Sequence, residues 1–164
     1  MPPGGRAGRP APGSGCLQPG RDPLTGSAVL FPVPPDRAFG YLADPRNRPA
    51  WQSSLRAVAD VVPGSDGSFT AVGTSWTDVT VVPGVRPLLR TVQSDEPVRW
   101  VEEGRFGPTN ARLALTFTPC PEGTQVGVEF TVTALGAGRL VTLLSRRAIV
   151  ADLRRAAGTL AASG

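Results

Sequence analysis

The clearest pattern in the chain is an alternation of apolar residues with polar or small ones in two runs, 112–118 and 125–132. The apolar members are Leu113, Leu115 and Phe117 in the first run and Val126, Val128, Phe130 and Val132 in the second. Alternation with a period of two is typical of strands with one buried face. If residues 120–123 form a loop, residues 113, 115 and 117 face 130, 128 and 126, so all these apolar side chains share one face of a hairpin.

Similar β-prone runs occur along most of the chain and are separated by turn residues such as Pro, Gly and Asp. They predict strands over 27–33, 55–62, 72–82, 85–93, 98–106, 109–118 and 124–135. Strands that recur at this spacing, each followed by its own turn, indicate an antiparallel meander. We therefore expect a curved antiparallel sheet of about seven strands.

Two segments have a helical pattern instead. Between the first two strands, Phe39 and Leu42 mark an apolar helix face, and Asp44-Pro45 is a restart signal for a second short helix. In that second helix we expect Arg46, Asn47 and Arg48 to face water. A long helix is predicted over residues 139–162, and its apolar stripe consists of Ile149, Leu153, Ala156 and Leu160. Leu140, Val141 and Leu144 are expected to bury a different surface.

Composition divides the chain into a leader and one domain. Residues 1–26 are rich in Pro and Gly and hold few large apolar side chains, so we expect a disordered leader. Residues 27–162 are the length of a single domain. The net charge of +4 is carried by arginine, without lysine. The basic last helix, with Arg146 and Arg147, leaves open a protein-interaction role, whereas no recognised nucleic-acid motif accompanies it.

The absence of histidine excludes several kinds of chemistry. Ser-His-Asp and Cys-His catalysis need that residue, and so do most zinc sites, so we expect no metal and no cofactor. No stretch approaches the length of about 18 apolar residues that a membrane-spanning helix needs. We expect a cytoplasmic protein without nucleic-acid partners, and the sequence leaves its oligomeric state open.

Five stretches carry a resemblance to a known family. They are VPPDRAFGYLADPRNRPAWQ at 33–52, VGTSW at 72–76, DEPVRW at 95–100, EGTQVGVEFTV at 122–132 and RRAIVADLRR at 146–155. Together with the order of elements, they resemble the START/Bet v 1-like (SRPBCC) superfamily, in its polyketide cyclase/dehydrase-like branch, over about residues 27–160. The resemblance implies an α+β helix-grip fold with a deep apolar cavity between the sheet and the long helix.

The resemblance implies less about activity. Members bind lipids, polyketides, hormones or quinones, a minority catalyse cyclisation or dehydration, and some belong to secondary metabolism. The catalytic residues of the aromatase/cyclase members have no matching positions here, so none is carried over.

Alternate residues of a strand point to opposite faces of a sheet, and this alternation makes Arg90 and Glu102 candidate catalytic residues. With Gly107-Pro108 as a hairpin tip, Glu102 faces Leu113 and points inward. With residues 95–97 as a loop, Arg90 pairs with Glu102 on the same face. In a cavity, Arg90 would polarise a carbonyl or enolate while Glu102 acted as acid or base. A different loop length would instead make them an ordinary salt bridge on the outer face.

Apolar residues on the same face are candidates for contact with a ligand. They are Trp51, Trp76, Trp100, Phe106, Leu113, Leu115, Phe117, Val128, Phe130, Ile149 and Leu153. The pattern leaves the direction of Trp76 and Asp78 open, because Val79 and Val81 could face inward instead. Three functions stay open at this point: a cyclase or dehydratase acting on an aromatic or polyketide-like molecule, a non-catalytic lipid or quinone carrier or sensor, and a protein-interaction module.

Overall fold

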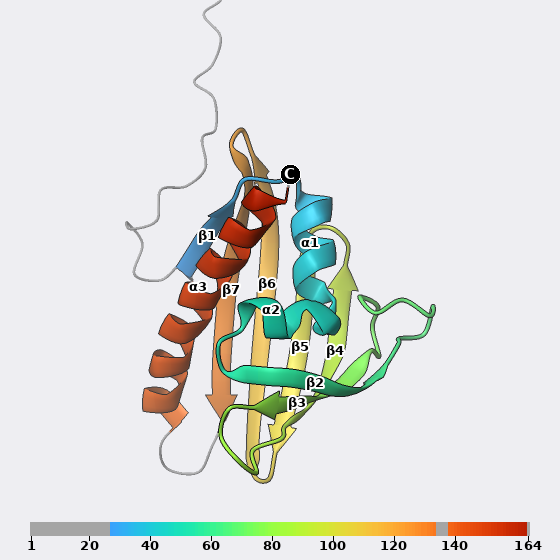
Figure 1. Ribbon diagram of the computed structural model, residues 1–164, viewed down its shortest axis with the longest axis vertical. Coiled ribbons are helices and arrows are strands. Elements are labelled where there is room, and N and C mark those ends of the chain that lie inside the picture. Colours follow the sequence, from blue (N-terminus) through green and yellow to red (C-terminus); the bar gives the residue numbers. More distant parts are fainter. Residues whose placement is uncertain (1–26, 134–137, 164) are drawn as a thin grey trace, which may run out of the picture.

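A single curved antiparallel sheet is the framework of the protein. The computed structural model describes residues 27–133 and 138–163, with side chains for 27–133 and 147–163. The seven strands lie in the order β1-β7-β6-β5-β4-β3-β2 (Figure 1). They are β1 (Ser27–Phe31), β2 (Leu55–Val62), β3 (Ser75–Thr80), β4 (Leu88–Asp95), β5 (Arg99–Phe106), β6 (Thr109–Cys120) and β7 (Gly123–Thr133). The predicted sheet is therefore confirmed.

The helices cover one face of this sheet. They are α1 (Pro35–Ala43), the short 3-10 helix η1 (Pro45–Asn47), α2 (Arg48–Trp51) and the long α3 (Gly138–Ala162). α3 packs on β1 and β7, α1 packs on β6, and α2 lies between β2 and α3 (Figure 1). This is the expected helix-grip α+β fold. Within the described part of the chain, no helix is long and apolar enough to cross a membrane.

Two hairpins have the register that the sequence predicts. Leu115 pairs with Val128 across β6 and β7, and Trp100 pairs with Leu115 across β5 and β6. The β6–β7 turn is tighter than expected, because Cys120 already pairs with Gly123, but the register is the same. Gly123 has φ +135°, and a Cβ there would lie 2.1 Å from the carbonyl oxygen of Phe31, so only glycine fits beside β1.

The β4–β5 register differs from the prediction. Arg90 pairs with Glu103, and Thr91 pairs with Glu102. The pairing then shifts between Thr91 and Gln93, where β4 carries an extra residue. The turn also comprises residues 96–98 rather than the predicted 95–97, because Asp95 pairs with Arg99. This shift moves each partner by two positions and keeps the predicted faces. The bulge moves the partners beyond it by one position, which reverses the face of Arg90, and the turn composition alone does not reveal it.

Two strands also begin three residues later than expected. β3 begins at Ser75 rather than 72, because Gly73 has a positive φ of 92° and its N–H bonds to the carbonyl of Thr91. β4 begins at Leu88, after a loop over 81–87. Predictions about the leader 1–26, residues 134–135 and the side chains of Leu140, Val141 and Leu144 lie outside the described residues.

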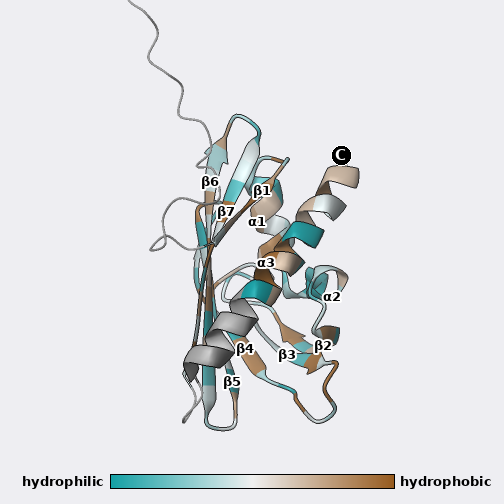
Figure 2. Cartoon of the chain, turned by 90° about the vertical axis from the view of Figure 1, so that its left-hand side faces the viewer, coloured by the Kyte–Doolittle hydropathy of each residue, from teal (hydrophilic) through white to brown (hydrophobic). Residues whose placement is uncertain are grey.

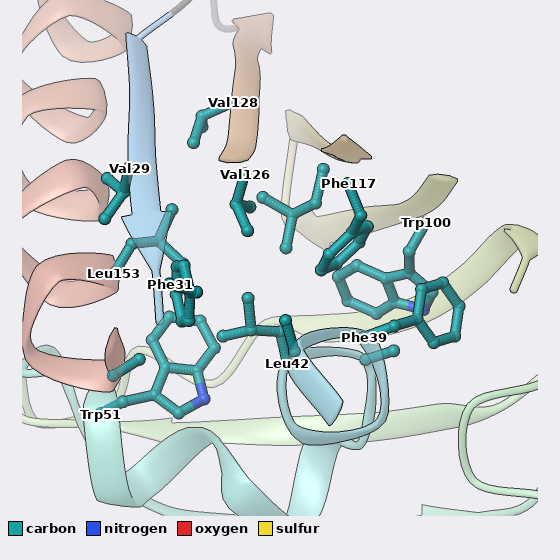
Figure 3. Packing of buried hydrophobic residues seen from close by; sticks show 14 of the residues in the cluster. Val29, Phe31, Phe39, Leu42, Trp51, Trp100, Phe117, Val126, Val128 and Leu153 are labelled. Atoms are coloured by element: carbon teal, nitrogen blue, oxygen red, sulfur yellow. The ribbon is translucent and has the colours of Figure 1, made fainter. Parts of the chain in front are cut away.

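The hydrophobic core fills the part of the concave face under α1, α2 and the C-terminal half of α3 (Figure 3). The α3 stripe is confirmed, since Leu153 and Ala156 are fully buried and Leu160 is nearly so. Phe39 of α1 contacts Phe117 of β6, with ring centroids 5.2 Å apart. This end of the concave face is therefore closed by packed side chains.

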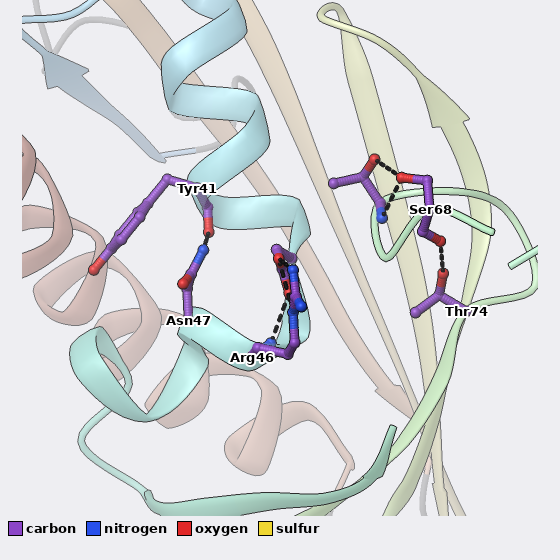
Figure 4. Close-up of polar contacts among 7 residues, drawn as sticks. Tyr41, Arg46, Asn47, Ser68 and Thr74 are labelled. Carbon is purple, nitrogen blue, oxygen red and sulfur yellow. Dashed lines mark hydrogen bonds and ion pairs between the residues drawn. The ribbon is translucent and has the colours of Figure 1, made fainter. Parts of the chain in front are cut away.

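A sharp corner joins α1 to α2. Asp44 ends α1 and caps η1, where its carboxylate accepts a hydrogen bond from the backbone N–H of Arg46 at 2.9 Å. The side-chain amide of Asn47 donates to the carbonyl of Tyr41 at 3.1 Å (Figure 4). These two bonds fix the direction of the chain just before Arg48.

Candidate functional site

A buried arginine holds two buried carboxylates together inside the protein. Nη1 of Arg48 donates to Oε2 of Glu102 at 2.5 Å, and Nη2 donates to Oδ2 of Asp78 at 3.3 Å. The three residues are 2 %, 5 % and 3 % exposed, respectively. They come from α2, β5 and β3, so the cluster ties the helical corner to the middle of the sheet.

The expectation that Arg48 faces water is wrong. Arg46 does lie outside, where it pairs with Asp44, but Arg48 begins α2 and turns inward with Trp51. Residues three apart share a face of a helix, and Trp51 is 2 % exposed. The spacing between Arg48 and Trp51 was therefore a signal in the sequence that could have identified Arg48.

Trp76 and Asp78 both point inward. Both side chains are buried on the concave face, and Nε1 of Trp76 donates to Oδ1 of Asp78 at 3.1 Å. The Trp76 ring stacks on Trp100, with centroids 6.4 Å apart. The guanidinium carbon of Arg48 lies 5.4 Å from the Trp76 ring centroid and 5.9 Å from that of Trp51, within cation–π range.

Burial raises the pKa of both carboxylates, those of Asp78 and Glu102. Burial, assisted by the nearby Asp78 charge, raises the pKa of Glu102 from 4.5 to about 7, although the adjacent Arg48 charge lowers it. Burial likewise raises the pKa of Asp78, although Arg48 and the Trp76 N–H oppose that shift. Burial disfavours the charged form of Arg48, but its two carboxylates outweigh this and leave its pKa raised. Glu102 can therefore take or give a proton near neutral pH.

A cavity of about 310 Å³ lies beside this cluster. Arg48, Asp78, Glu102 and Asp152 line it and are all buried, whereas Ser54, Arg105 and Phe106 line it and are exposed. The buried residues mark its closed end, and the exposed ones mark its mouth. The volume is at the lower end of the range for small-molecule pockets.

Some buried polar atoms of residues that line the cavity have no hydrogen-bond partner within the described residues. They are Nε of Arg48, Nε1 of Trp51 and Oε1 of Gln52, and all three residues line the cavity. Buried polar groups are normally paired, and leaving one unpaired costs free energy. Two of these atoms are N–H donors, and they belong to residues of the cavity wall although the atoms themselves are buried.

The predicted ligand-contact residues divide into two groups. Those that line the cavity are Trp51, Phe106, Leu113, Phe130 and Ile149. Those that lie instead in the packed core are Trp76, Trp100, Leu115, Phe117, Val128 and Leu153. The division arises because α1 and α2 fill one end of the concave face, which leaves room only toward the β5–β6 turn. Ala111 and Asp152 line the cavity although sequence reasoning did not select them.

The predicted pairing of Arg90 with Glu102 is not present. Arg90 is exposed and lies opposite Glu103 on the outer face of the sheet. The shifted β4–β5 register is the cause. Glu102 does point inward, as its pairing with Leu113 indicated, and Arg48 occupies the position beside it that was expected for Arg90.

The site does not hold the ligands of a metal. Among the described residues, no group of three or more His, Cys, Asp or Glu side chains is placed to hold a metal ion. Asp78 and Glu102 are instead bridged by the guanidinium of Arg48.

Comparison with known proteins agrees with this architecture. Residues 25–163 match the family described as "Polyketide cyclase / dehydrase and lipid transport", so the chain belongs to that family. The search of curated proteins finds no match. Family and fold together define a domain of the polyketide cyclase/dehydrase or START-like ligand-binding kind.

Several solved structures share the fold at low sequence identity. A protein from Thermus thermophilus is 19 % identical with a TM-score of 0.64, over 85 % of this chain and 98 % of that one. A START superfamily protein from Mycobacterium smegmatis is 12 % identical with a TM-score of 0.63, over 85 % and 97 %. DynU16, a protein of the dynemicin biosynthetic locus, is 19 % identical with a TM-score of 0.58, over 83 % and 46 %.

Proposed function

We propose that the protein binds an aromatic or polyketide-like small molecule in the cavity beside Arg48 and Glu102, and catalyses its cyclisation or dehydration. The observation that carries the proposal is the place of Glu102: a buried carboxyl with a pKa of about 7 that lines an otherwise mainly apolar cavity. Ionisable groups with strongly shifted pKa values in a cavity are typical of acid–base sites.

The cavity wall favours a flat, oxygen-bearing ligand. Trp51, Phe106, Leu113, Phe130 and Ile149 supply apolar and aromatic surface. Arg48 and Trp51 each hold a buried N–H group without a partner within the described residues, and a small rotation of either side chain would turn that donor toward a carbonyl or phenol oxygen. A ligand with an apolar ring and a carbonyl would therefore satisfy both the surface and the spare donors. A plain hydrocarbon chain would satisfy only the surface.

Glu102 has the properties of a general base and acid. In its ionised form, it can take a proton from a carbon next to a carbonyl, and the resulting enolate carbon attacks a second carbonyl of the same molecule. The proton transfer moves the negative charge from Glu102 to the substrate oxygen, beside the cationic Arg48. Protonated Glu102 returns that proton to the alkoxide formed by the attack, which becomes a hydroxyl. Ionised Glu102 then takes a second proton from the same carbon and gives it to the departing hydroxyl, so that ring formation is followed by the loss of one water.

A turnover assay tests this role directly. A linear phenyl-substituted triketone, which cyclises with loss of one water to a phenyl-substituted resorcinol, serves as substrate. Glu102→Gln should lower the enzymatic rate by about 100-fold or more while changing KM little, because general catalysis by one group typically contributes a factor of 10² to 10⁴. Glu103→Gln, the adjacent residue on the outer face, is the matched control and should retain the rate.

A carrier or sensor is the second candidate function. Arg48 is already paired with Asp78 and Glu102, and an arginine held in this way can stabilise the fold without acting on a ligand. A carrier binds the same class of ligand but leaves it unchanged. Equal rates in the wild type and in Glu102→Gln, with a ligand still bound in the cavity, would contradict the catalytic proposal and favour the carrier.

A further inference from the structure

The open end of the cavity carries exposed apolar side chains. Val81 and Val82, in the loop between β3 and β4, are 43 % and 55 % exposed, and Phe106, at the end of β5, is 44 % exposed. Phe106 also lines the cavity. Exposed large apolar residues that gather around one opening mark an interaction surface more often than scattered ones do.

These residues lie at the same end of the molecule. The N–H of Val81 donates to the carbonyl of Ser54, a residue of the cavity mouth, at 2.9 Å. The β3–β4 loop and the β5–β6 turn both reach the lower end in Figure 1 and in Figure 2, where the loop below β2 and β3 has hydrophobic colour. We define the mouth rim as residues 52–56, 81–88 and 105–110, which surround this opening.

The mouth rim carries one sign of charge. Arg56, Arg86 and Arg105 are exposed there, and the three segments contain no Asp or Glu. The guanidinium of Arg56 donates to the carbonyl of Val81 at 3.4 Å, so cationic and apolar groups adjoin. The acidic residues at the opposite end, near the other turns of the sheet and the start of α1, are Asp36, Asp95, Glu96 and Glu122.

We infer that the mouth rim docks on the surface of an anionic lipid bilayer. Arginines bind the anionic headgroups, while Val81, Val82 and Phe106 reach the boundary of the acyl chains. An anionic lipid surface fits this rim because the rim combines exposed arginines with exposed apolar side chains and contains no Asp or Glu. A docked rim lets a hydrophobic ligand pass between bilayer and cavity without crossing water.

Vesicle co-sedimentation of the full chain tests the inference without any cavity ligand, so its outcome is independent of the proposed function. Wild type should bind vesicles of phosphatidylglycerol and phosphatidylcholine, and should bind pure phosphatidylcholine far more weakly. Arg86→Gln should weaken binding about fivefold, since one arginine near an anionic surface contributes about a factor of this size. Arg37→Gln, on the exposed side of α1, is its control and should change binding little.

The apolar part of the rim has a closely matched control. Val82 and Val98 are 55 % and 57 % exposed, but Val98 lies in the β4–β5 turn at the opposite end of the sheet. Val82→Ser should lower vesicle binding about fivefold, because it removes apolar surface that enters the bilayer, whereas Val98→Ser should leave it unchanged. Equal effects of the two substitutions would overturn the inference. So would binding to polyglutamate without binding to vesicles, which would point to an acidic protein instead.

Discussion

The guanidinium of Arg48 lies 2.5 Å from the carboxylate of Glu102, although 54 residues separate the two in the sequence. Both side chains are buried, and a second carboxylate, that of Asp78, contacts the same guanidinium. One cation therefore faces two buried acids. This imbalance determines how the site responds to mutation and to pH.

Removal of Arg48 should destabilise the fold strongly. Arg48→Met leaves two buried carboxylates without their cation, and breaking a buried ion pair from one side costs about 3–5 kcal/mol. Urea denaturation near neutral pH measures this loss. The control is Arg112→Met, which breaks the exposed pair of Arg112 with Glu103 on the outer face and should have a much smaller effect. Similar losses for the two variants would contradict the buried arrangement.

The stability of the wild type should fall with pH because of Glu102. Its folded pKa of about 7 lies above the ordinary value of 4.5, so between these values the folded state binds more protons than the unfolded state. Its contribution is fully present below about pH 4.5 and is lost as the pH rises through about 7. Between about pH 5 and 8 the wild type should therefore lose roughly 2–3 kcal/mol relative to Glu102→Gln, at 1.36 kcal/mol per pKa unit.

Denaturant titrations of both proteins at several pH values check this. Glu103→Gln serves as the control, since residue 103 is exposed and should reproduce the wild-type profile. A difference between wild type and Glu102→Gln that stays constant with pH would show that Glu102 titrates normally.

Filling the cavity should abolish ligand binding without unfolding the protein. Ala111 lines the cavity and pairs with Gly104, so the ring of Ala111→Phe should occupy the space beside Leu113. The neutral fluorescent probe N-phenyl-1-naphthylamine should bind the wild type with enhanced emission and bind this variant at least tenfold more weakly. Ala57→Phe, at an exposed position on β2, controls for the added ring and should bind like the wild type. Unchanged binding in Ala111→Phe would place the probe elsewhere.

Local patterns in the sequence predict most of the sheet. The alternation in β6 and β7, with a short turn between them, determines their register, and the tip at Gly107-Pro108 does the same for β5 and β6. Parity then places Glu102 on the concave face. These inferences hold because a tight turn connects the two strands of each hairpin. The length of that turn then determines which residues lie opposite each other along both strands.

The partner of Glu102 could not be derived in the same way. The bulge after Thr91 shifts β4 by one residue, which moves Arg90 to the outer face opposite Glu103. Arg48 reaches Glu102 only through the tertiary packing of α2 against the sheet, a contact that no strand parity describes. The packing of α1 and α2 also explains why Trp100 and Phe117 lie in the core and not in the cavity.

The most direct test of the central claim, that this cavity binds an oxygen-bearing hydrophobic molecule, is native mass spectrometry of the protein purified gently from the organism that makes it. The account predicts a discrete additional mass in the wild type that organic extraction removes. The same mass should be absent from Ala111→Phe produced in that organism. An additional mass of equal abundance in Ala111→Phe, or a wild type that carries none even after incubation with the triketone or its cyclised product, would contradict the account.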